Sequence, residues 1–266
     1  MRPFLPWLAT SVAGHRRVDD LNLVLLHERD FSGPDQVTLS DARAAHLLEV
    51  LRVTPKQTVR VGRLDGPLGV GIVESAAEGR VTLRCSFEAD SPARPRIDLL
   101  LAVPRPKVMR RLWAQLAALG VGQIILTNAE RVERQYFDTH VLAESTYRPL
   151  LIEGLQQAGD TRLPAVSVHR QFKILVEDRL DALFGDGLRL VADHRATSSI
   201  GSAIGEQRSE RILLAIGPEG GWNDFELTLL QARGFRQVGM GPRTLRVDTA
   251  CTALLAIAHA SIQPRA

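Results

Sequence analysis

The spacing of apolar and polar residues divides the chain into two regions. In the first, short apolar runs alternate with closely spaced turn residues, a pattern that predicts strands. The expected strands cover residues 21–26, 58–61, 70–73 and 81–85. Ala44, Leu47, Leu48 and Leu51 recur at helical spacing and predict one helix over residues 41–51. Short strands with tight turns indicate a small β-barrel.

A proline-rich stretch at residues 90–95 ends this region and marks the expected domain boundary. Beyond it, apolar strand-like runs alternate with amphipathic helices. The expected strands cover residues 97–103, 123–127, 188–192 and 211–216, and the expected helices cover residues 106–119 and 143–158. This alternation predicts an α/β domain with a mostly parallel sheet that helices cover on both faces.

The length of 266 residues fits two domains, which we place at residues 21–90 and 96–264 after a disordered extension at residues 1–20. The longest uncharged apolar run, residues 249–262, is shorter than the roughly 20 residues that a bilayer requires, so no membrane partner is expected. Cys85 and Cys251 lie far apart, and no metal-ligand spacing occurs. We therefore expect no disulfide and no metal, and a reducing, cytoplasmic location.

The basic residues are almost all of one kind, because 30 arginines accompany only three lysines. The planar guanidinium group suits bidentate contacts with phosphate. A biased base composition of the genome explains the same excess equally well, and the net charge of +3 decides little. The arginines alone therefore leave RNA binding open.

A glycine-rich loop follows the apolar strand expected at residues 211–216. Asn223 and Glu226 have the spacing of a capping box, and Trp222 and Leu227 have that of a hydrophobic staple, so a helix is expected to begin there. Glycines between a strand end and a helix start let a ligand approach the backbone, although a simple tight turn has the same composition. The loop lacks the lysine of a P-loop, and no GxGxxG motif occurs in the chain.

A second glycine loop follows the strand expected at residues 235–240. It contains Arg243 and Arg246, which suit an anion or RNA site or, alternatively, a solvated turn. An alanine-rich helix comes next. Its small side chains permit close packing under a loop or across a dimer, and they are also strong helix formers.

The two loops together resemble the signature of the RsmE family of the SPOUT superfamily. The motif from Ile216 to Gly221 is followed by a motif from Leu245 to Ala250, in the family's order and at a suitable spacing. Two positions differ from the family pattern, since Asp248 stands where glutamate is usual and Gly159 where arginine is common.

This resemblance implies a PUA-like N-terminal barrel domain and a C-terminal SPOUT domain with a trefoil knot. It also implies a homodimer that transfers methyl from S-adenosylmethionine to ring N3 of a uridine in 16S ribosomal RNA of the 30S subunit. The residues that the resemblance assigns to the cofactor are Ala192, Ile216, Gly217, Pro218, Glu219, Gly220, Gly221, Val238, Gly239, Met240, Gly241, Leu245 and Thr249.

Arg246 is the expected catalytic residue, because a cation beside the uracil stabilises the negative charge that N3 develops. Binding of phosphate or a capping role in the fold are the alternatives for this side chain. The residues expected to contact RNA are Arg43, Arg52, Lys56, Arg105, Lys107, Arg110 and Arg243.

Other functions remain open at this point. The same chemistry on another RNA site differs only in surfaces that the motifs do not describe. A non-catalytic RNA-binding assembly factor is the alternative of a different class. A nucleotide hydrolase is the least favoured, because neither a Walker lysine nor an acidic metal cluster is visible.

Overall fold

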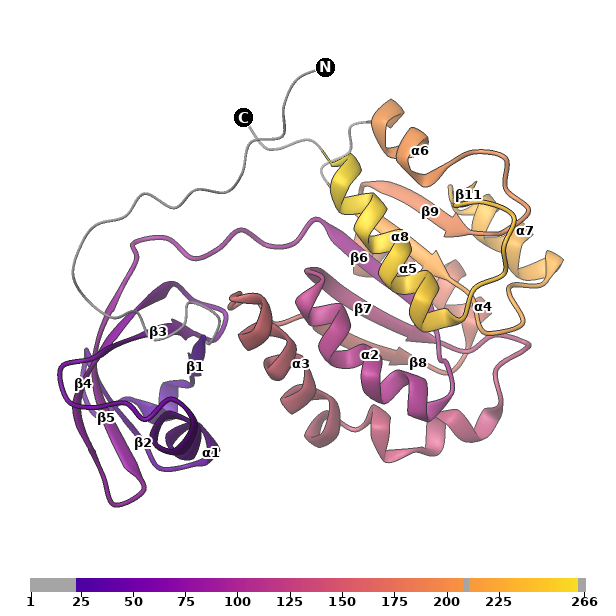
Figure 1. Ribbon diagram of the computed structural model, residues 1–266. Coiled ribbons are helices and arrows are strands. Elements are labelled where there is room, and N and C mark those ends of the chain that lie inside the picture. The colour runs from indigo at the N-terminus through magenta and orange to yellow at the C-terminus, as the bar shows by residue number, and fades with distance from the viewer. Residues whose placement is uncertain (1–22, 208–210, 263–266) are drawn as a thin grey trace.

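A computed structural model describes residues 23–207 and 211–262, so the extension expected at residues 1–20 lies outside the described residues. The described chain folds into two sheets with separate sequence ranges (Figure 1). A linker without strands or helices joins them over residues 88–96, where the proline-rich boundary is expected. The smaller sheet precedes this linker and the larger sheet follows it.

The smaller sheet has five strands in the order β1-β3-β4-β5-β2. Its strands are β1 Val24–Leu26, β2 Gln36–Leu39, β3 Thr58–Arg63, β4 Leu68–Ala77 and β5 Arg80–Phe87. Only β1 and β3 pair in parallel, and the other neighbours are antiparallel. Among the described residues β1 and β2 do not pair with each other, so the sheet curls but stays open. The expectation of a barrel is therefore corrected to an open, curled sheet.

One helix lies against this curled sheet (Figure 1). It begins as α1 Ala42–Ala45 and continues as a π-helical segment, His46–Val50, which agrees with the helix expected over residues 41–51. Ala44 and Leu47 are fully buried in the core of this sheet, together with Val61 and Leu83. The helical spacing of these apolar residues therefore identified the face that packs on the sheet.

The larger sheet has six strands in the order β11-β9-β10-β6-β7-β8, and all neighbours are parallel. Its strands are β6 Ile97–Ala102, β7 Val121–Thr127, β8 Ala165–His169, β9 Leu188–Ala192, β10 Ile212–Ile216 and β11 Arg236–Val238. Every residue of β6 and β10 is buried. Strands covered on both faces have uninterrupted apolar sequences, which is why these two central strands were predictable.

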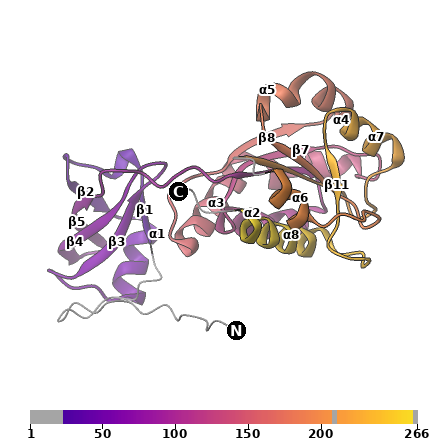
Figure 2. The same ribbon diagram turned by 90° about the horizontal axis from the view of Figure 1, so that it is seen from above.

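Helices cover both faces of this sheet, as the alternating pattern predicts (Figure 2). On one face lie α2, α3, α6 and α8, and on the other lie α4, α5 and α7. Their bounds are α2 Pro106–Ala118, α3 Glu144–Ala158, α4 Phe172–Ile174, α5 Leu180–Phe184, α6 Ile200–Gln207, α7 Asp224–Ala232 and α8 Val247–Ser261. A π-helical segment, Leu175–Arg179, joins α4 to α5. The sequence pattern did not predict β2, β8, α6 or the α4–α5 segment.

The packing of α2 against α3 depends on a glycine. A Cβ at Gly154 would lie 2.1 Å from the carbonyl oxygen of Ala114, so the two helix backbones are in direct contact there. Trp113 of α2 packs against Tyr147 of α3, with ring centroids 4.9 Å apart and the rings tilted by 32°. Its Nε1 donates to the carbonyl oxygen of Val141 at 3.0 Å. These contacts fix α2, whose N-terminus reaches the site described next.

Candidate functional site

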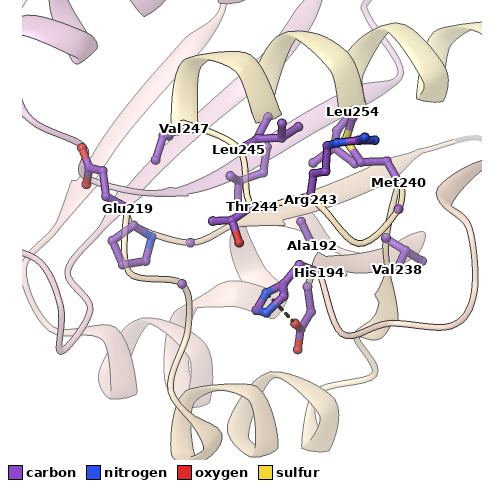
Figure 3. A pocket seen from close by; sticks show the side chains of 18 of the residues that line it. Ala192, His194, Glu219, Val238, Met240, Arg243, Thr244, Leu245, Val247 and Leu254 are labelled. Carbon is purple, nitrogen blue, oxygen red and sulfur yellow. Dashed lines mark ion pairs between the residues drawn. The ribbon is translucent and has the colours of Figure 1, made fainter.

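A cavity of about 250 Å³ opens at the carboxyl ends of β9, β10 and β11. It lies where the three loops after these strands meet the first turns of α8 (Figure 3). Ligands of open α/β sheets bind at this edge, so the position favours a binding site. The lining residues are Ala192, Asp193, His194, Ile216, Gly217, Pro218, Glu219, Gly220, Gly221, Val238, Gly239, Met240, Gly241, Arg243, Thr244, Leu245, Val247, Ala250 and Leu254.

The first glycine loop is built as its sequence predicts. Asn223 caps α7: its Oδ1 accepts from the backbone N–H of Glu226, and the Glu226 Oε2 accepts from the backbone N–H of Asn223, both at 2.8 Å. Trp222 and Leu227, at the staple positions, are both buried. Gly221 has a φ of 72°, a conformation that glycine adopts without strain. The capping box therefore fixes where the loop ends and α7 begins.

Three further contacts tie this loop to the neighbouring loops after β6 and β7. The Oε1 of Glu219 accepts from the backbone N–H of Arg105 at 3.1 Å. The guanidinium of Arg131 donates to the carbonyl oxygen of Gly220. The Oε1 of Glu226, a side chain that is 3% exposed, accepts from the backbone N–H of Glu130 at 2.7 Å. The loop conformation is thus supported by the segments that follow two neighbouring strands, β6 and β7.

The second glycine loop runs beside the chain that leaves β9. The backbone N–H of Gly239 donates to the carbonyl oxygen of Ser198 at 2.9 Å, and the carbonyl oxygen of Gly239 accepts from the N–H of Ile200 at 3.2 Å. A Cβ at Gly239 would lie 3.2 Å from the carbonyl oxygens of Asp193 and Ala196. A side chain at this position would require the two segments beside the cavity to move apart by a few tenths of an ångström, so their close approach favours glycine.

Charged groups occur at the third loop, which follows β9. Burial opposes ionisation of Asp193, but hydrogen bonds from Arg195 outweigh it and lower the pKa of this carboxyl below its ordinary value. His194 faces the cavity and has its Nδ1 3.5 Å from Asp193 Oδ1 (Figure 3). The spacing of the histidines predicts no role for His194 itself. The loop that contains it is nevertheless predicted through Ala192, because it directly follows a strand of the parallel sheet.

The predicted cofactor residues meet at this one cavity, with one exception. All line it except Thr249, whose side chain is exposed in the first turn of α8. Its neighbours Val247 and Ala250 line the cavity instead, and so does Thr244 of the second glycine loop. Leu254 is a further lining residue, which neither motif indicated. The rotation of α8 about its axis decides which of its residues face the cavity, and the motif alone does not specify that rotation.

The predicted catalytic and RNA-contacting residues differ in whether they line the cavity. Arg246 is exposed at the N-cap of α8, between the lining residues Leu245 and Val247, and does not itself line the cavity. Arg243 lines it. Five other predicted RNA contacts are exposed: Arg52, Lys56, Arg105, Lys107 and Arg110.

Arg43 is the predicted RNA contact that the structure corrects. Its guanidinium donates to both carboxylate oxygens of Asp30 at 2.6 and 2.8 Å, to the carboxylate of Asp41 at 2.7 Å and to the carbonyl oxygen of Leu25 at 2.7 Å. The side chain is only 16% exposed. Its donors therefore hold the N-terminal sheet together, and no RNA contact is proposed for it.

The cavity offers binding groups of mixed character. Aliphatic side chains of Ile216, Leu245 and Leu254 provide apolar walls, and the glycine loops bring peptide groups to its surface. In residues 23–207 and 211–262, His, Cys, Asp and Glu side chains form no cluster that could hold a metal ion. Within the same residues, no helix has the length and apolar character needed to cross a membrane. The geometry suits an organic ligand with apolar and polar parts.

Comparisons with known proteins agree with the two motifs. Residues 91–259 match the family model described as an RNA methyltransferase domain. The ribosomal RNA small subunit methyltransferase E of Treponema pallidum is 32% identical over 249 residues, which cover 90% of this chain and 92% of the relative. The ribosomal RNA small subunit methyltransferase E 1 of Borreliella burgdorferi is 23% identical, over 88% of this chain and 95% of its own.

The fold agrees as well. A crystal structure of a ribosomal RNA small subunit methyltransferase E from Neisseria gonorrhoeae, bound to S-adenosyl methionine, superposes with a TM-score of 0.74 at 21% identity. The match covers 91% of this chain and 98% of that one. The family resemblance predicted from the two motifs is confirmed, and the chain belongs to the ribosomal RNA small subunit methyltransferase E family, the RsmE family.

Proposed function

We propose that the protein transfers a methyl group from S-adenosylmethionine to ring N3 of a uridine in 16S ribosomal RNA of the small subunit. The observation that carries the proposal is the convergence of both family motifs on one cavity at the carboxyl edge of a parallel sheet. Family membership over 90% of the chain supports the reaction class and the RNA substrate. The choice of uridine N3 comes from the motif resemblance.

The lining of the cavity fits S-adenosylmethionine. Glycines at positions 217, 220, 221, 239 and 241 leave the backbone accessible, and the apolar walls suit an adenine ring. Bound there, this cofactor supplies an already activated methyl group. The remaining work of the protein is to orient the two reactants in line. We assign this orienting role to Ile216, Pro218, Glu219, Val238, Met240, Leu245 and Ala192, along with the glycines.

Uridine N3 carries a proton and lies on the pairing edge of the base, so the base must be unpaired or flipped out to react. Arg246 is exposed beside the cavity and has no ion pair among the described residues. A guanidinium in this position stabilises the negative charge that N3 acquires when its proton leaves. We therefore propose Arg246 as the residue that contacts the reacting base.

We further propose that the N-terminal region, residues 23–90, is a PUA-like RNA-binding domain and that residues 96–262 are a SPOUT methyltransferase domain. The exposed cations Arg52 and Lys56 lie in the first of these domains. Arg105, Lys107 and Arg110 lie at the start of α2, next to the glycine loop that Arg105 contacts through its backbone. Together with Arg243 they form the proposed phosphate contacts.

A trefoil knot in the C-terminal domain is also proposed. Strand β11 lies at the sheet edge beside β9, whereas the following helix α8 packs on the central strands β10 and β6 and on α6. The chain after β11 must therefore cross the connection between β9 and β10 to reach the centre. An experimental electron-density map that traces residues 193–216 and 239–247 decides whether it threads that connection.

We propose a homodimer in which α8 contributes to the contact. The outer face of α8 exposes Ala256, Ile257 and Ala260, which permit close approach of a second helix. Light scattering after size exclusion tests the oligomeric state, and a monomer at micromolar concentration overturns it. A cytoplasmic location follows from a ribosomal RNA substrate, and fractionation of cells tests it.

Primer extension on small-subunit RNA tests the function directly. N3-methylation blocks base pairing, so reverse transcriptase stops at the modified uridine. We expect one stop to vanish when the gene is deleted and to return with the wild-type gene but not with Arg246→Ala. Arg80→Gln, an exposed arginine on the N-terminal sheet, is the matched control and should restore the stop. An unchanged set of stops would show that 16S uridine N3 is not the target.

A second measurement separates an inactive RNA-binding protein from an enzyme with another target. Isothermal titration of S-adenosylmethionine into the purified protein is expected to show saturable binding. Gly239→Val, which fills the close approach beside the cavity, should abolish it. If the wild type binds RNA but not the cofactor, the protein is an RNA-binding assembly factor. If the protein binds the cofactor but deletion of its gene changes no reverse-transcriptase stop in 16S RNA, its substrate is another RNA.

A further inference from the structure

A second and larger cleft lies at the opposite end of the strands of the parallel sheet. Its volume is about 910 Å³, and it is bounded by the amino ends of β6, β7 and β8 and by the turn at Asp65 in the N-terminal sheet. Strands β6 and β7, of six and seven residues, separate it from the cofactor cavity. This is a distance of about 20 Å at roughly 3.3 Å per residue. Neither family motif reaches this cleft.

Backbone and side-chain hydrogen bonds hold the walls of this cleft in place. The backbone N–H of Asp65 donates to the carbonyl oxygen of Thr161 at 2.8 Å, and Thr161 Oγ1 donates to the carbonyl oxygen of Gly66 at 2.6 Å. A carboxylate oxygen of Asp65 accepts from the backbone N–H of Leu163 at 3.0 Å. The two domains therefore meet through specific bonds, and the cleft between them has a defined shape.

The lining of this cleft is strongly basic. It contains five arginines and three carboxylates. The arginines are Arg94, Arg96, Arg148, Arg162 and Arg211, and the carboxylates are Asp65, Asp98 and Glu144. Five positive and three negative charges leave a net charge of +2 in one concave surface. Such a surface concentrates anions, because a low-dielectric wall focuses the field.

The carboxylates do not neutralise all of the arginines. Asp98 is buried against Arg211, and Glu144 is 3.7 Å from Arg148 in an exposed pair, which stabilises little. Arg94 is exposed and has no ion pair with any described residue. At least one guanidinium is thus available for a ligand on the open side of the cleft.

Arg162 is the best-oriented cation of the cleft. Its Nε donates to the carbonyl oxygen of Pro92 at 2.6 Å and its Nη1 donates to the carbonyl oxygen of Asp65 at 2.9 Å. It has no carboxylate partner within the described residues, so its positive charge is balanced only by two peptide dipoles. A guanidinium fixed in this way presents its remaining N–H groups in a set direction, which suits a phosphate oxygen.

We propose that this cleft binds phosphate groups of the RNA backbone, at a point remote from the methylated base. The identity of the ligand as RNA rests on the proposed function, whereas the preference for phosphate rests on the cleft itself. The cleft is too large for a single ion and lies between the two domains, so it suits a stretch of polyanion that spans both. The cleft adds a binding surface at the amino ends of the strands, whereas the cofactor cavity lies at their carboxyl ends.

The test measures RNA affinity as a function of salt with the full-length protein. The double variant Arg94→Gln and Arg148→Gln removes two cations and leaves Arg162, which joins the domains, intact. Each lost phosphate contact lowers the slope of log K against log salt by about 0.7–0.9, so the double variant should lose roughly 1.5. At physiological salt this corresponds to about 10- to 30-fold weaker binding of a 16S RNA fragment. Thermal unfolding and cofactor affinity should match the wild type.

Arg80→Gln is the matched control, because Arg80 is exposed at the far end of the N-terminal sheet and has no ion pair with a described residue. If the salt slope of the double variant equals that of the control, the cleft does not contact RNA and the inference is wrong. Titration of inorganic phosphate forms a second arm. The double variant could lose phosphate binding, which the control keeps, while the salt slope of RNA binding stays unchanged. That result would assign the cleft to a free anion and overturn RNA as its ligand.

The same experiment separates this inference from the proposed function. Methyl transfer to the RNA fragment is followed in parallel with radiolabelled S-adenosylmethionine. A changed salt slope without any methyl transfer by the wild type supports the cleft and refutes the enzyme. Methyl transfer with an unchanged slope supports the enzyme and refutes the cleft.

Discussion

Replacement of Glu226 is the sharpest test of how the glycine loop is held. This buried carboxylate accepts two backbone N–H groups, from Asn223 at 2.8 Å and from Glu130 at 2.7 Å. It therefore joins the start of α7 to the chain that follows β7. Glu226→Ala removes both acceptors and leaves two donors unsatisfied in a region closed to solvent.

The cost follows from these bonds. A hydrogen bond to a charged group contributes about 1.5–3 kcal/mol, and an unpaired buried donor bears its full desolvation penalty. Two such bonds give an expected loss of about 3–6 kcal/mol, a large fraction of the stability of a domain. Glu226→Gln keeps one acceptor and turns an NH₂ group toward the other donor. We expect it to lose about half as much.

Urea unfolding followed by tryptophan fluorescence is the assay, because Trp222, directly before this helix, and Trp113 are both buried and become exposed on unfolding. The midpoint should fall by roughly 1–2 M for Glu226→Ala. Asp224→Ala is the matched control in the same helical turn. Its side chain is 92% exposed, so solvent screens its ion pair with Arg195, which should contribute little to stability.

Cofactor affinity is the second readout, since the loop that Glu226 supports lines the cavity. Both Glu226 variants should bind S-adenosylmethionine more weakly than Asp224→Ala does. Equal midpoints for Glu226→Ala and Asp224→Ala would refute the reasoning, because they would mean that the two buried bonds contribute no net stability.

Three other substitutions have expected outcomes. Gly154→Ala places a Cβ 2.1 Å from a backbone oxygen of α2 and should destabilise the protein by about 1–3 kcal/mol, measured as a lower melting temperature. Gly239→Ala places a Cβ 3.2 Å from two backbone carbonyl oxygens beside the cavity. It should weaken cofactor binding, measured by calorimetry, and change the melting temperature only slightly. Burial opposes ionisation of Asp30, but hydrogen bonds from Arg43 outweigh it and lower its pKa, so the stability that it contributes is present above the unfolded pKa of about 4 and is lost as pH falls through the folded value. The gap in urea midpoint between wild type and Asp30→Asn should therefore shrink from about pH 6 to about pH 3, and a constant gap would contradict this.

Local rules in the sequence determined much of the secondary structure. The bounds of β9 and nearly those of β6, β10 and α2 were predicted, because strands buried on both faces and an amphipathic helix with an initial proline have strong local signals. The capping box likewise located the start of α7. In contrast, β8 is half exposed at the sheet edge and mixes polar with apolar residues, so no periodicity identified it. The α4–α5 segment was missed as well, and its helical turns are interrupted by a π-helical segment.

The candidate site, too, was predicted in part from local sequence and decided in part by the tertiary structure. Two glycine motifs identified both loops and the family, since glycine at a strand end reflects a local backbone requirement. The tertiary structure decided that β11 returns beside β9, which brings Asp193 and His194 to loops more than 20 residues away in sequence. It also decided that Arg43 binds Asp30 inside the N-terminal sheet and that five arginines gather in one cleft. Burial and charge pairing depend on contacts between distant segments, and a one-dimensional pattern does not contain them.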